Sequence, residues 1–201
     1  MRPDGLVQGR TNTLRAIAAL AIAGAVLGGC AGRSTITGRV RPASPDVVIM
    51  AWPVDGKPAA TPRDTARVVQ VKGRFEPRVL VVQTGTPIAF ENRDKTWHNA
   101  FCVVPGGRFD LGRYRKGQVR QTTLGKPGVY QVFCEMHPKE SLYVVVVPDR
   151  WHTTPADDGS FSLAQMPRGE YVLRAWHPVR GQVTKKIAVP TRDPALLRLP
   201  N

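Results

Sequence analysis

Residues 75–94 read FEPRVLVVQTGTPIAFENRD, and this stretch gives the clearest local indication of the fold expected for the chain. It contains two short runs, Val79–Val82 and Pro87–Phe90, that are rich in β-branched and aromatic residues. Gly85 separates the runs, and turn-forming Asn and Asp residues follow the second one. The stretch therefore predicts two short β-strands joined by a turn.

The same pattern continues on both sides of this stretch. Turn signals at Gly106-Gly107, Gly117 and Pro127-Gly128 separate further apolar runs, which predict strands at Val68–Val71, Val119–Leu124, Val129–Phe133 and Leu142–Val147. With 201 residues, of which 42% are hydrophobic, the chain can build one large or two small packed domains. The predicted fold class is all-β, a sandwich or barrel of short strands.

The formal net charge of +14 indicates a surface that attracts anionic partners. The basic residues are scattered through predicted strands and turns, and no helix-turn-helix, zinc-finger or RNA-binding aromatic motif is present in the sequence. We therefore expect no nucleic-acid function, and expect the charge to favour an acidic protein partner.

The N-terminus has the pattern of an export signal. Arg2, Arg10 and Arg15 precede Ala16–Leu27, an apolar run too short for a membrane-spanning helix, which needs about 20 residues. The run leads into Leu27-Gly28-Gly29-Cys30, which resembles the bacterial lipobox. The resemblance implies a lipoprotein signal peptide over 1–29 and a lipid anchor on Cys30 that holds the protein to the cell envelope, facing the periplasm. Gly32, rather than an aspartate, favours the outer membrane over the inner, and an ordinary signal peptide is the alternative.

Three residues in the middle of the chain form a candidate copper site. Cys134 and His137 are two residues apart in one predicted loop, and His98 lies in a distant loop. A thiolate and two imidazoles with a weak axial ligand suit a single copper ion. The alternative for Cys134 is a disulfide with Cys102, whose default interpretation is a small buried apolar residue.

Over residues 66–148 the chain resembles the cupredoxins of the amicyanin and plastocyanin type. The motifs that carry the resemblance occur in order: 75–94, His98-Asn99, Phe109-Asp110-Leu111-Gly112, Pro127-Gly128-Val129-Tyr130 and Cys134-x-x-His137. It implies a Greek-key β-sandwich with His98, Cys134 and His137 as ligands of one copper ion. It also implies that the Asn99 side chain ties the two ligand loops together.

The axial position departs from the family. The two positions at which these proteins carry an axial Met hold Glu140 and Leu142, and Met136 lies inside the Cys–His gap. Three outcomes follow: Glu140 ligates, the site is three-coordinate, or the site is degenerate. We take Glu140 as the axial ligand, which predicts a lower potential than that of a Met-ligated site.

The C-terminal part resembles the carboxypeptidase regulatory-like, or transthyretin-like, β-sandwich module. Residues 154–177 match its signature, with hairpin turns expected at Asp158-Gly159 and Arg168-Gly169. The module's first strands have counterparts only near the N-terminus, at Ile36–Val40 and Val47–Trp52. We therefore expect a discontinuous sandwich of 34–60 plus 149–201, with the cupredoxin domain (66–148) inserted and Ala59–Asp64 as linker. Several exported proteins, some described as methylamine-utilisation proteins, are similar to this arrangement.

The function expected from these patterns is single-electron transfer between an acidic redox partner and the copper site. Copper storage or delivery is one alternative, and a metal-free structural or binding protein is another. We expect no enzymatic activity, because the sequence offers no paired-carboxylate cleft, nucleophile elbow or second copper cluster. His152 and His177 are expected to be structural or surface residues.

Overall fold

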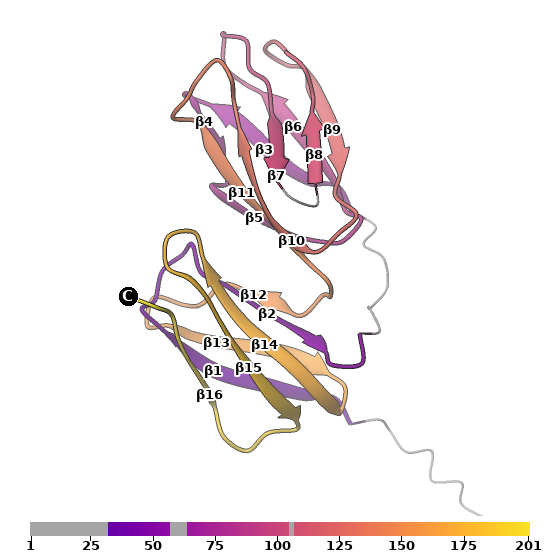
Figure 1. The fold of residues 1–201 in the computed structure, drawn as a ribbon, viewed down its shortest axis with the longest axis vertical. Coiled ribbons are helices and arrows are strands. Elements are labelled where there is room, and N and C mark those ends of the chain that lie inside the picture. The colour runs from indigo at the N-terminus through magenta and orange to yellow at the C-terminus, as the bar shows by residue number, and fades with distance from the viewer. Residues whose placement is uncertain (1–31, 57–63, 105–106) are drawn as a thin grey trace, which may run out of the picture. The chain divides into compact units, whose positions relative to one another are not determined.

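The computed structural model describes residues 32–56, 64–104 and 107–201. The predicted signal peptide (1–29), the predicted lipidation site Cys30 and all but the last residue of the predicted linker Ala59–Asp64 lie outside the described residues. Every regular element of the described part is a β-strand, which confirms the all-β fold class (Figure 1). No helix long and apolar enough to cross a membrane occurs in these three ranges.

The middle of the chain folds into a sandwich of two sheets. One sheet has the order β4-β3-β6-β9 and contains Ala66–Val71 (β3), Arg74–Glu76 (β4), Pro87–Asn92 (β6) and Val119–Thr123 (β9). The other has the order β5-β11-β10-β7-β8 and contains Val79–Gln83 (β5), Phe101–Val104 (β7), Gly107–Asp110 (β8), Gly128–Phe133 (β10) and Ser141–Val147 (β11). Most neighbouring strands are antiparallel, but β3 is parallel to β6 and β5 to β11.

The core of this sandwich comes from inward-facing residues of both sheets. Phe90, Val132 and Leu142 are fully buried in it, and Phe75 meets Phe90 edge to face at 6.2 Å between ring centroids. Six strands expected from the sequence are present, with ends that differ by at most two residues. The rigid core leaves the loops at the sandwich ends to carry chemistry.

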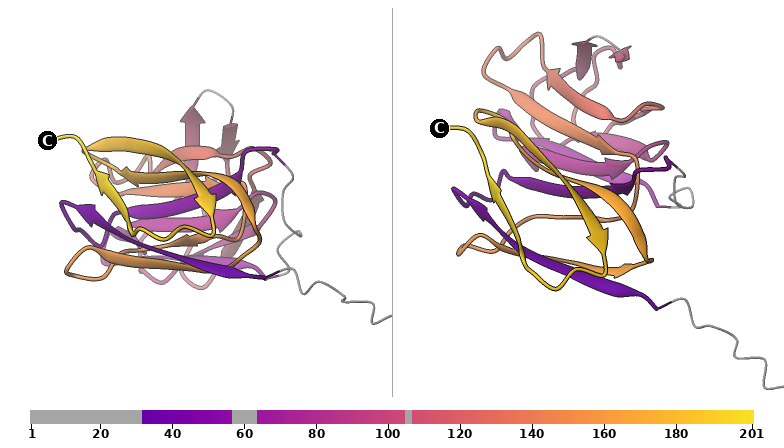
Figure 2. Two further views of the ribbon diagram at one scale, coloured as in Figure 1. Left: turned by 90° about the horizontal axis from the view of Figure 1, so that it is seen from below. Right: turned by 60° about the horizontal axis from the view of Figure 1, so that its bottom comes forward.

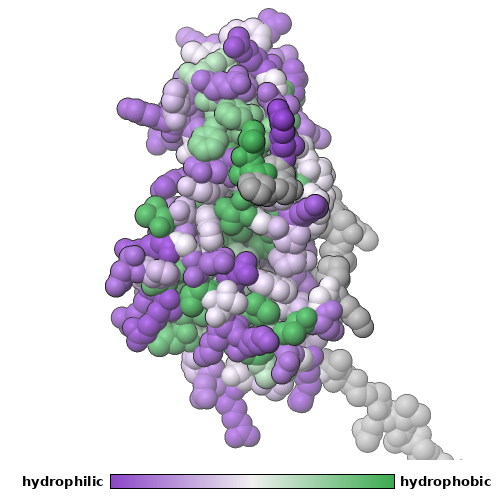
Figure 3. All heavy atoms as spheres, in the orientation of Figure 1, coloured by the Kyte–Doolittle hydropathy of each residue, from purple (hydrophilic) through white to green (hydrophobic). Residues whose placement is uncertain are grey.

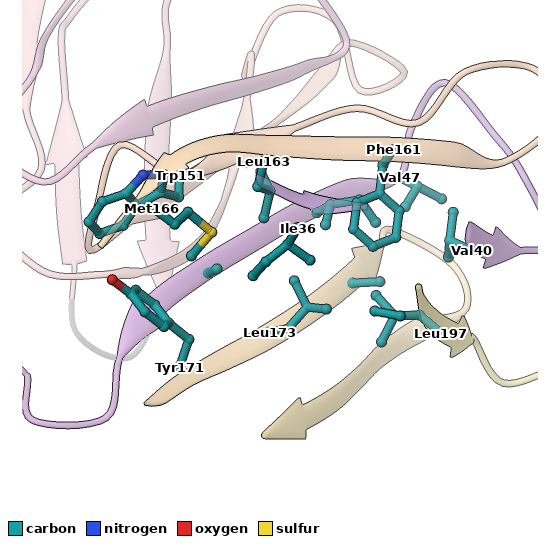
Figure 4. Packing of buried hydrophobic residues seen from close by; sticks show 14 of the residues in the cluster. Ile36, Val40, Val47, Trp151, Phe161, Leu163, Met166, Tyr171, Leu173 and Leu197 are labelled. Carbon is teal, nitrogen blue, oxygen red and sulfur yellow. The ribbon is translucent and has the colours of Figure 1, made fainter. Parts of the chain in front are cut away.

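A second, smaller sandwich contains strands from both ends of the chain. Its three-stranded sheet has the order β13-β1-β16, built from Ser34–Arg41 (β1), Ser160–Met166 (β13) and Ala195–Arg198 (β16). Its four-stranded sheet has the order β12-β2-β14-β15, built from Val48–Pro53 (β2), His152–Thr153 (β12), Gly169–His177 (β14) and Gly181–Val189 (β15). Figure 4 shows their buried side chains, among them Ile36, Leu173 and Leu197, meeting between the two sheets.

The central strand β1 joins the two ends of the chain. It pairs antiparallel with β13 and parallel with β16, so Gly38 lies opposite both Phe161 and Ala195. A Cβ atom at Gly38 would lie 2.4 Å from the Ala195 carbonyl oxygen and 2.4 Å from the Phe161 ring. Only glycine lets the three strands approach this closely.

The expected hairpins of the C-terminal part are wrong. The Asp158-Gly159 turn connects β12 to β13 and the Arg168-Gly169 turn connects β13 to β14, but each pair of strands lies in different sheets. These turns therefore carry the chain from one sheet to the other. The hairpin of this region is β14–β15, in register from Gly169↔Val189 to His177↔Gly181.

A third apolar cluster contains residues of both sandwiches, whose strands Figure 2 shows from two further sides. Val48 and Trp176 of the smaller sandwich pack with Val145 and Val147 of the larger one. Tyr143 meets Trp176 edge to face at 5.5 Å between ring centroids. Strands β2, β11 and β14 thus bury residues on both of their faces.

Candidate metal centre

Two loops at one end of the larger sandwich bring four donor side chains together. Cys134 directly follows β10 and Glu140 directly precedes β11, so 134–140 is the loop of the β10–β11 hairpin. Backbone hydrogen bonds close this loop, from Cys134 N to Glu140 O and from Glu140 N to His137 O. His98 comes from the chain after β6 and is bridged to Tyr114 by two backbone hydrogen bonds.

The donor atoms of His98, Cys134, His137 and Glu140 all lie within 4.8 Å of one another. Cys134 Sγ lies 3.7 Å from His98 Nδ1 and 3.5 Å from His137 Nδ1. Glu140 Oε2 lies 2.9 Å from His98 Nδ1 and 3.3 Å from His137 Nδ1. One thiol, two imidazoles and one carboxylate therefore face a common point through their lone-pair-bearing atoms.

Burial differs among the four residues. His98, Cys134 and Glu140 are buried, whereas the His137 side chain is 34% exposed. Glu140 Oε1 is buried and has no hydrogen-bond partner among the described residues. A buried carboxylate oxygen without a partner costs free energy unless a cation or donor compensates it. The cluster thus contains a hydrogen-bond acceptor, Glu140 Oε1, for which the described part of the protein supplies no donor.

Burial also controls the state of the thiol. Desolvation raises the pKa of Cys134 above its ordinary value, and the Glu140 carboxylate raises it further. The backbone N–H groups of Asn99 and Met136 act in the opposite direction. A cation held among these groups would favour the thiolate over the thiol, which is the form that ligates metals.

Asn99 connects the two loops that carry the donors. Its Oδ1 accepts a hydrogen bond of 2.8 Å from Glu135 N, one residue after Cys134. Asn99 is itself buried, and its backbone carbonyl accepts a hydrogen bond from Gln70 Nε2. The His98 loop and the Cys134 loop are therefore tied to each other by a side chain and not only by packing.

A buried polar framework beneath the site was not found by sequence reasoning. Asn92 Nδ2 donates to the carbonyls of Thr96 and Tyr114, and Asn92 Oδ1 accepts from Asp94 N. Tyr114 OH donates to Gln70 Oε1 in the same interior. The sequence contains one indication of this framework, Asn92 in the stretch 75–94. Its hydrogen-bond partners could not be predicted, because they lie as far as 22 residues away.

The remaining candidate residues lie outside the cluster. Cys102 is fully buried in the larger core, and both it and Cys134 are free thiols, so the disulfide alternative is not formed. His177 Nδ1 accepts hydrogen bonds from Val179 N and Arg180 N in the β14–β15 turn. His152 is partly buried, which lowers its pKa. Met136 is partly buried and packs against the larger core.

The surface contains polar residues over most of the face shown in Figure 3, with hydrophobic residues in small areas between them. Trp97, next to His98, is 49% exposed, and the Arg115 guanidinium lies over its ring at 5.4 Å from the centroid. An aromatic ring with a stacked cation thus stands beside the loop that carries His98.

The sandwich and its donor cluster define a β-protein with a candidate metal centre, and comparison with known proteins gives its family. A model of the cupredoxin-like domain matches residues 47–147, about half of the chain. The chain belongs to this cupredoxin-like family. The match begins before β2, a strand that pairs with β14 in the smaller sandwich.

Solved structures with similarity to the chain include a purple cupredoxin from Nitrosopumilus maritimus (24% identity, 40% of this chain and 98% of that one, TM-score 0.37). A reduced amicyanin variant shares 26% identity over 48% of this chain and 98% of that one, with a TM-score of 0.39. A copper-containing nitrite reductase from Thermus scotoductus SA-01 shares 25% identity over 47% of this chain and 26% of that one, with a TM-score of 0.40. No curated protein matches the sequence.

Proposed function

We propose that the protein is an electron carrier that binds one copper ion through His98, Cys134 and His137, with Glu140 as the fourth ligand. The observation that carries the proposal is the convergence of four donor atoms within 4.8 Å, three of them on buried residues. Membership of the cupredoxin-like family supports the same assignment.

The donor set fits copper by its chemistry. A thiolate with two imidazoles suits mononuclear copper sites, and a weak further ligand tunes them. Copper held there would supply the one-electron couple between Cu(II) and Cu(I). The protein's contribution is a loop closed by hydrogen bonds and a buried His98, which keep the donors in place in both oxidation states.

Glu140 is suited to the fourth position by its location. Its Oε2 is within 3.3 Å of both imidazole Nδ1 atoms, and its Oε1 lacks a hydrogen-bond partner in the described part of the chain. A hard carboxylate oxygen favours Cu(II) over Cu(I) more than a thioether sulfur does. We therefore expect a reduction potential lower than that of a site with an axial Met.

His137 is the part of the cluster that a partner can reach, because a third of its side chain is exposed. The net charge of +14 supports an acidic redox partner. An anionic reagent such as ferricyanide should therefore oxidise the reduced protein faster than a cationic reagent of equal driving force. Added salt should reduce that difference.

The proposed function is tested by loading the protein with Cu(II) and recording voltammograms alongside copper loss to a chelator. An electron carrier gives one reversible one-electron wave and retains its copper in both states. Rapid loss of Cu(I) to the chelator would move the assignment to copper storage or delivery. Failure to bind copper at all would leave a metal-free structural protein and overturn the proposal.

We further propose that the protein is held to the cell envelope, facing the periplasm, by a lipid on Cys30. The support is the sequence: an apolar run at Ala16–Leu27 followed by Leu27-Gly28-Gly29-Cys30. A Cys30→Ser variant expressed in a bacterium should leave the membrane fraction for the soluble one, because its anchor cannot form. Wild-type protein in the soluble fraction would contradict the anchor.

The smaller sandwich is proposed as a discontinuous module of the carboxypeptidase regulatory-like type, made of 34–60 and 149–201. Its support is the resemblance at 154–177 together with the pairing of β1 with β13 and β16 and of β2 with β14. No donor group of the metal cluster lies in this module. Its part in the proposed function is therefore to support the larger sandwich through the shared apolar cluster.

A further inference from the structure

The imidazole of His98 is held from both sides. Its Nδ1 faces Cys134 and Glu140, and its Nε2 lies 3.2 Å from Asp94 Oδ2 on the other edge of the ring. His98 is completely buried, so water does not compete for this second nitrogen. Thr96 Oγ1, at 3.4 Å, is the other group near Nε2.

Asp94 is itself fixed by the turn between β3 and β4. Its Oδ1 accepts a hydrogen bond of 2.7 Å from Lys72 N, and its Oδ2 accepts one of 3.0 Å from Gly73 N. Lys72 and Gly73 both have a positive φ, 54° and 67°. In this conformation their successive backbone N–H groups point toward the same carboxylate, that of Asp94. The Asp94 backbone N–H is bound by Asn92 Oδ1 at 2.8 Å.

We propose that Asp94 is the positioning residue of the metal centre, acting through His98 and held by the β3–β4 turn. This inference rests on the proposed function. Asp94 Oδ2 accepts a hydrogen bond from the Nε2–H of His98. The lone pair of the imidazole is then on Nδ1, the atom that faces the other donors. The other three donor residues and Asn99 take no part in this hydrogen bond.

The carboxylate also changes the donor strength of His98. An imidazole whose N–H is bound by a carboxylate is a more basic ligand, which favours Cu(II) over Cu(I). Loss of Asp94 should therefore raise the reduction potential and loosen the His98 ring. Outer-sphere changes of this kind typically cost about 10–100-fold in metal affinity. A tenfold loss of the preference for Cu(II) corresponds to a rise of about 59 mV for one electron.

The experiment compares Asp94→Ala and Asp94→Asn with wild type and with Glu135→Gln in the full chain. Glu135→Gln is the matched control, because it removes one negative charge beside Cys134 from an exposed side chain. Two quantities are measured: the reduction potential, and the solvent exchange of the His98 Nε2–H by NMR in the Cu(I) form. Circular dichroism checks that each variant is folded.

We expect Asp94→Ala to raise the potential by about 59 mV or more and to speed exchange of the Nε2–H at least tenfold. Asp94→Asn, which keeps a neutral acceptor, should shift both quantities less. Glu135→Gln should leave the exchange rate unchanged. If folded Asp94→Ala and Asp94→Asn match the control in both quantities while wild type binds copper, the role of Asp94 is overturned and the proposed function stands. If wild type shows no copper couple, both are overturned.

Discussion

Replacing Cys134 with serine is expected to remove the intense visible absorption of the copper-loaded protein completely. That absorption arises from charge transfer between a thiolate sulfur and Cu(II), and a serine hydroxyl has no equivalent donor orbital. Cys134 Sγ is the only sulfur in the donor group, at 3.5 and 3.7 Å from the two imidazole Nδ1 atoms. The measurement is a Cu(II) titration followed by visible and electron paramagnetic resonance spectra. Copper affinity should also fall by more than the roughly 10–100-fold of outer-sphere changes.

Cys102→Ala is the matched control for this variant. Cys102 is also buried in the core of the larger sandwich, but it is not part of the donor group. Its loss should leave the spectrum unchanged and cost about 1 kcal/mol of stability through a small cavity. An unchanged band in Cys134→Ser, or a band lost in Cys102→Ala, would contradict the assigned ligand set.

Glu140→Met is expected to raise the reduction potential of the copper-loaded protein by about 59 mV or more, a tenfold or larger loss of preference for Cu(II). The carboxylate Oε2 lies within 3.3 Å of both imidazoles, and a thioether at the same position is a softer donor that favours Cu(I). The visible spectrum should shift with it, because the fourth ligand alters the copper–thiolate bond. Voltammetry and absorption spectra of the two proteins provide the comparison.

Glu140→Gln separates ligand charge from ligand position. It keeps the length of the side chain and one carbonyl oxygen, so its potential should fall between those of wild type and Glu140→Met. Wild type and Glu140→Met with identical spectra and potentials would show that Glu140 does not ligate. The site would then be three-coordinate, with Glu140 as a buried neighbour of the two imidazoles.

The sequence predicted the larger sandwich well because each strand there has a local signal. The runs at Val79–Val82 and Pro87–Phe90 became β5 and β6 with their expected turn at Gly85. Strands β4 and β8 were not predicted, since each has only three or four residues and its regular structure depends on its neighbours. A strand cannot be predicted from the local sequence when it is too short to show alternation of apolar and polar residues.

The C-terminal errors have a different cause. The turn signals at Asp158-Gly159 and Arg168-Gly169 were correct as turns, but a turn residue does not state whether the next strand joins the same sheet. That choice is set by the burial of Ile36, Leu163 and Leu173 between two sheets, which is a tertiary property. The partners of β1 could be expected only from a whole-module resemblance, because they lie more than 120 residues away.

The four donor residues could be predicted from residue type and spacing. The hydrogen bonds that hold these residues in place could not. Cys134 and His137 lie within one loop, and motif order supplied His98 and Glu140. The contact of Asp94 with His98 depends on a turn at Lys72 and Gly73, 21 or 22 residues away. The residue types of that turn do not predict that its backbone N–H groups donate to a carboxylate.

The parallel pairing of β1 with β16 has a consequence for the order in which the chain can fold as it is synthesised. Strand β1 is among the first described segments to be synthesised. One of its edges can pair only after residues 160–166 are made, and the other only after residues 195–198 are made. The larger sandwich needs nothing beyond Val147 for its own strands and can be complete earlier. During that interval the nascent chain carries β1 with both edges unpaired, and an unpaired strand edge can mispair with other chains. Pairing with β13 and then with β16 occupies both edges of β1, after which the strand is no longer available to another chain.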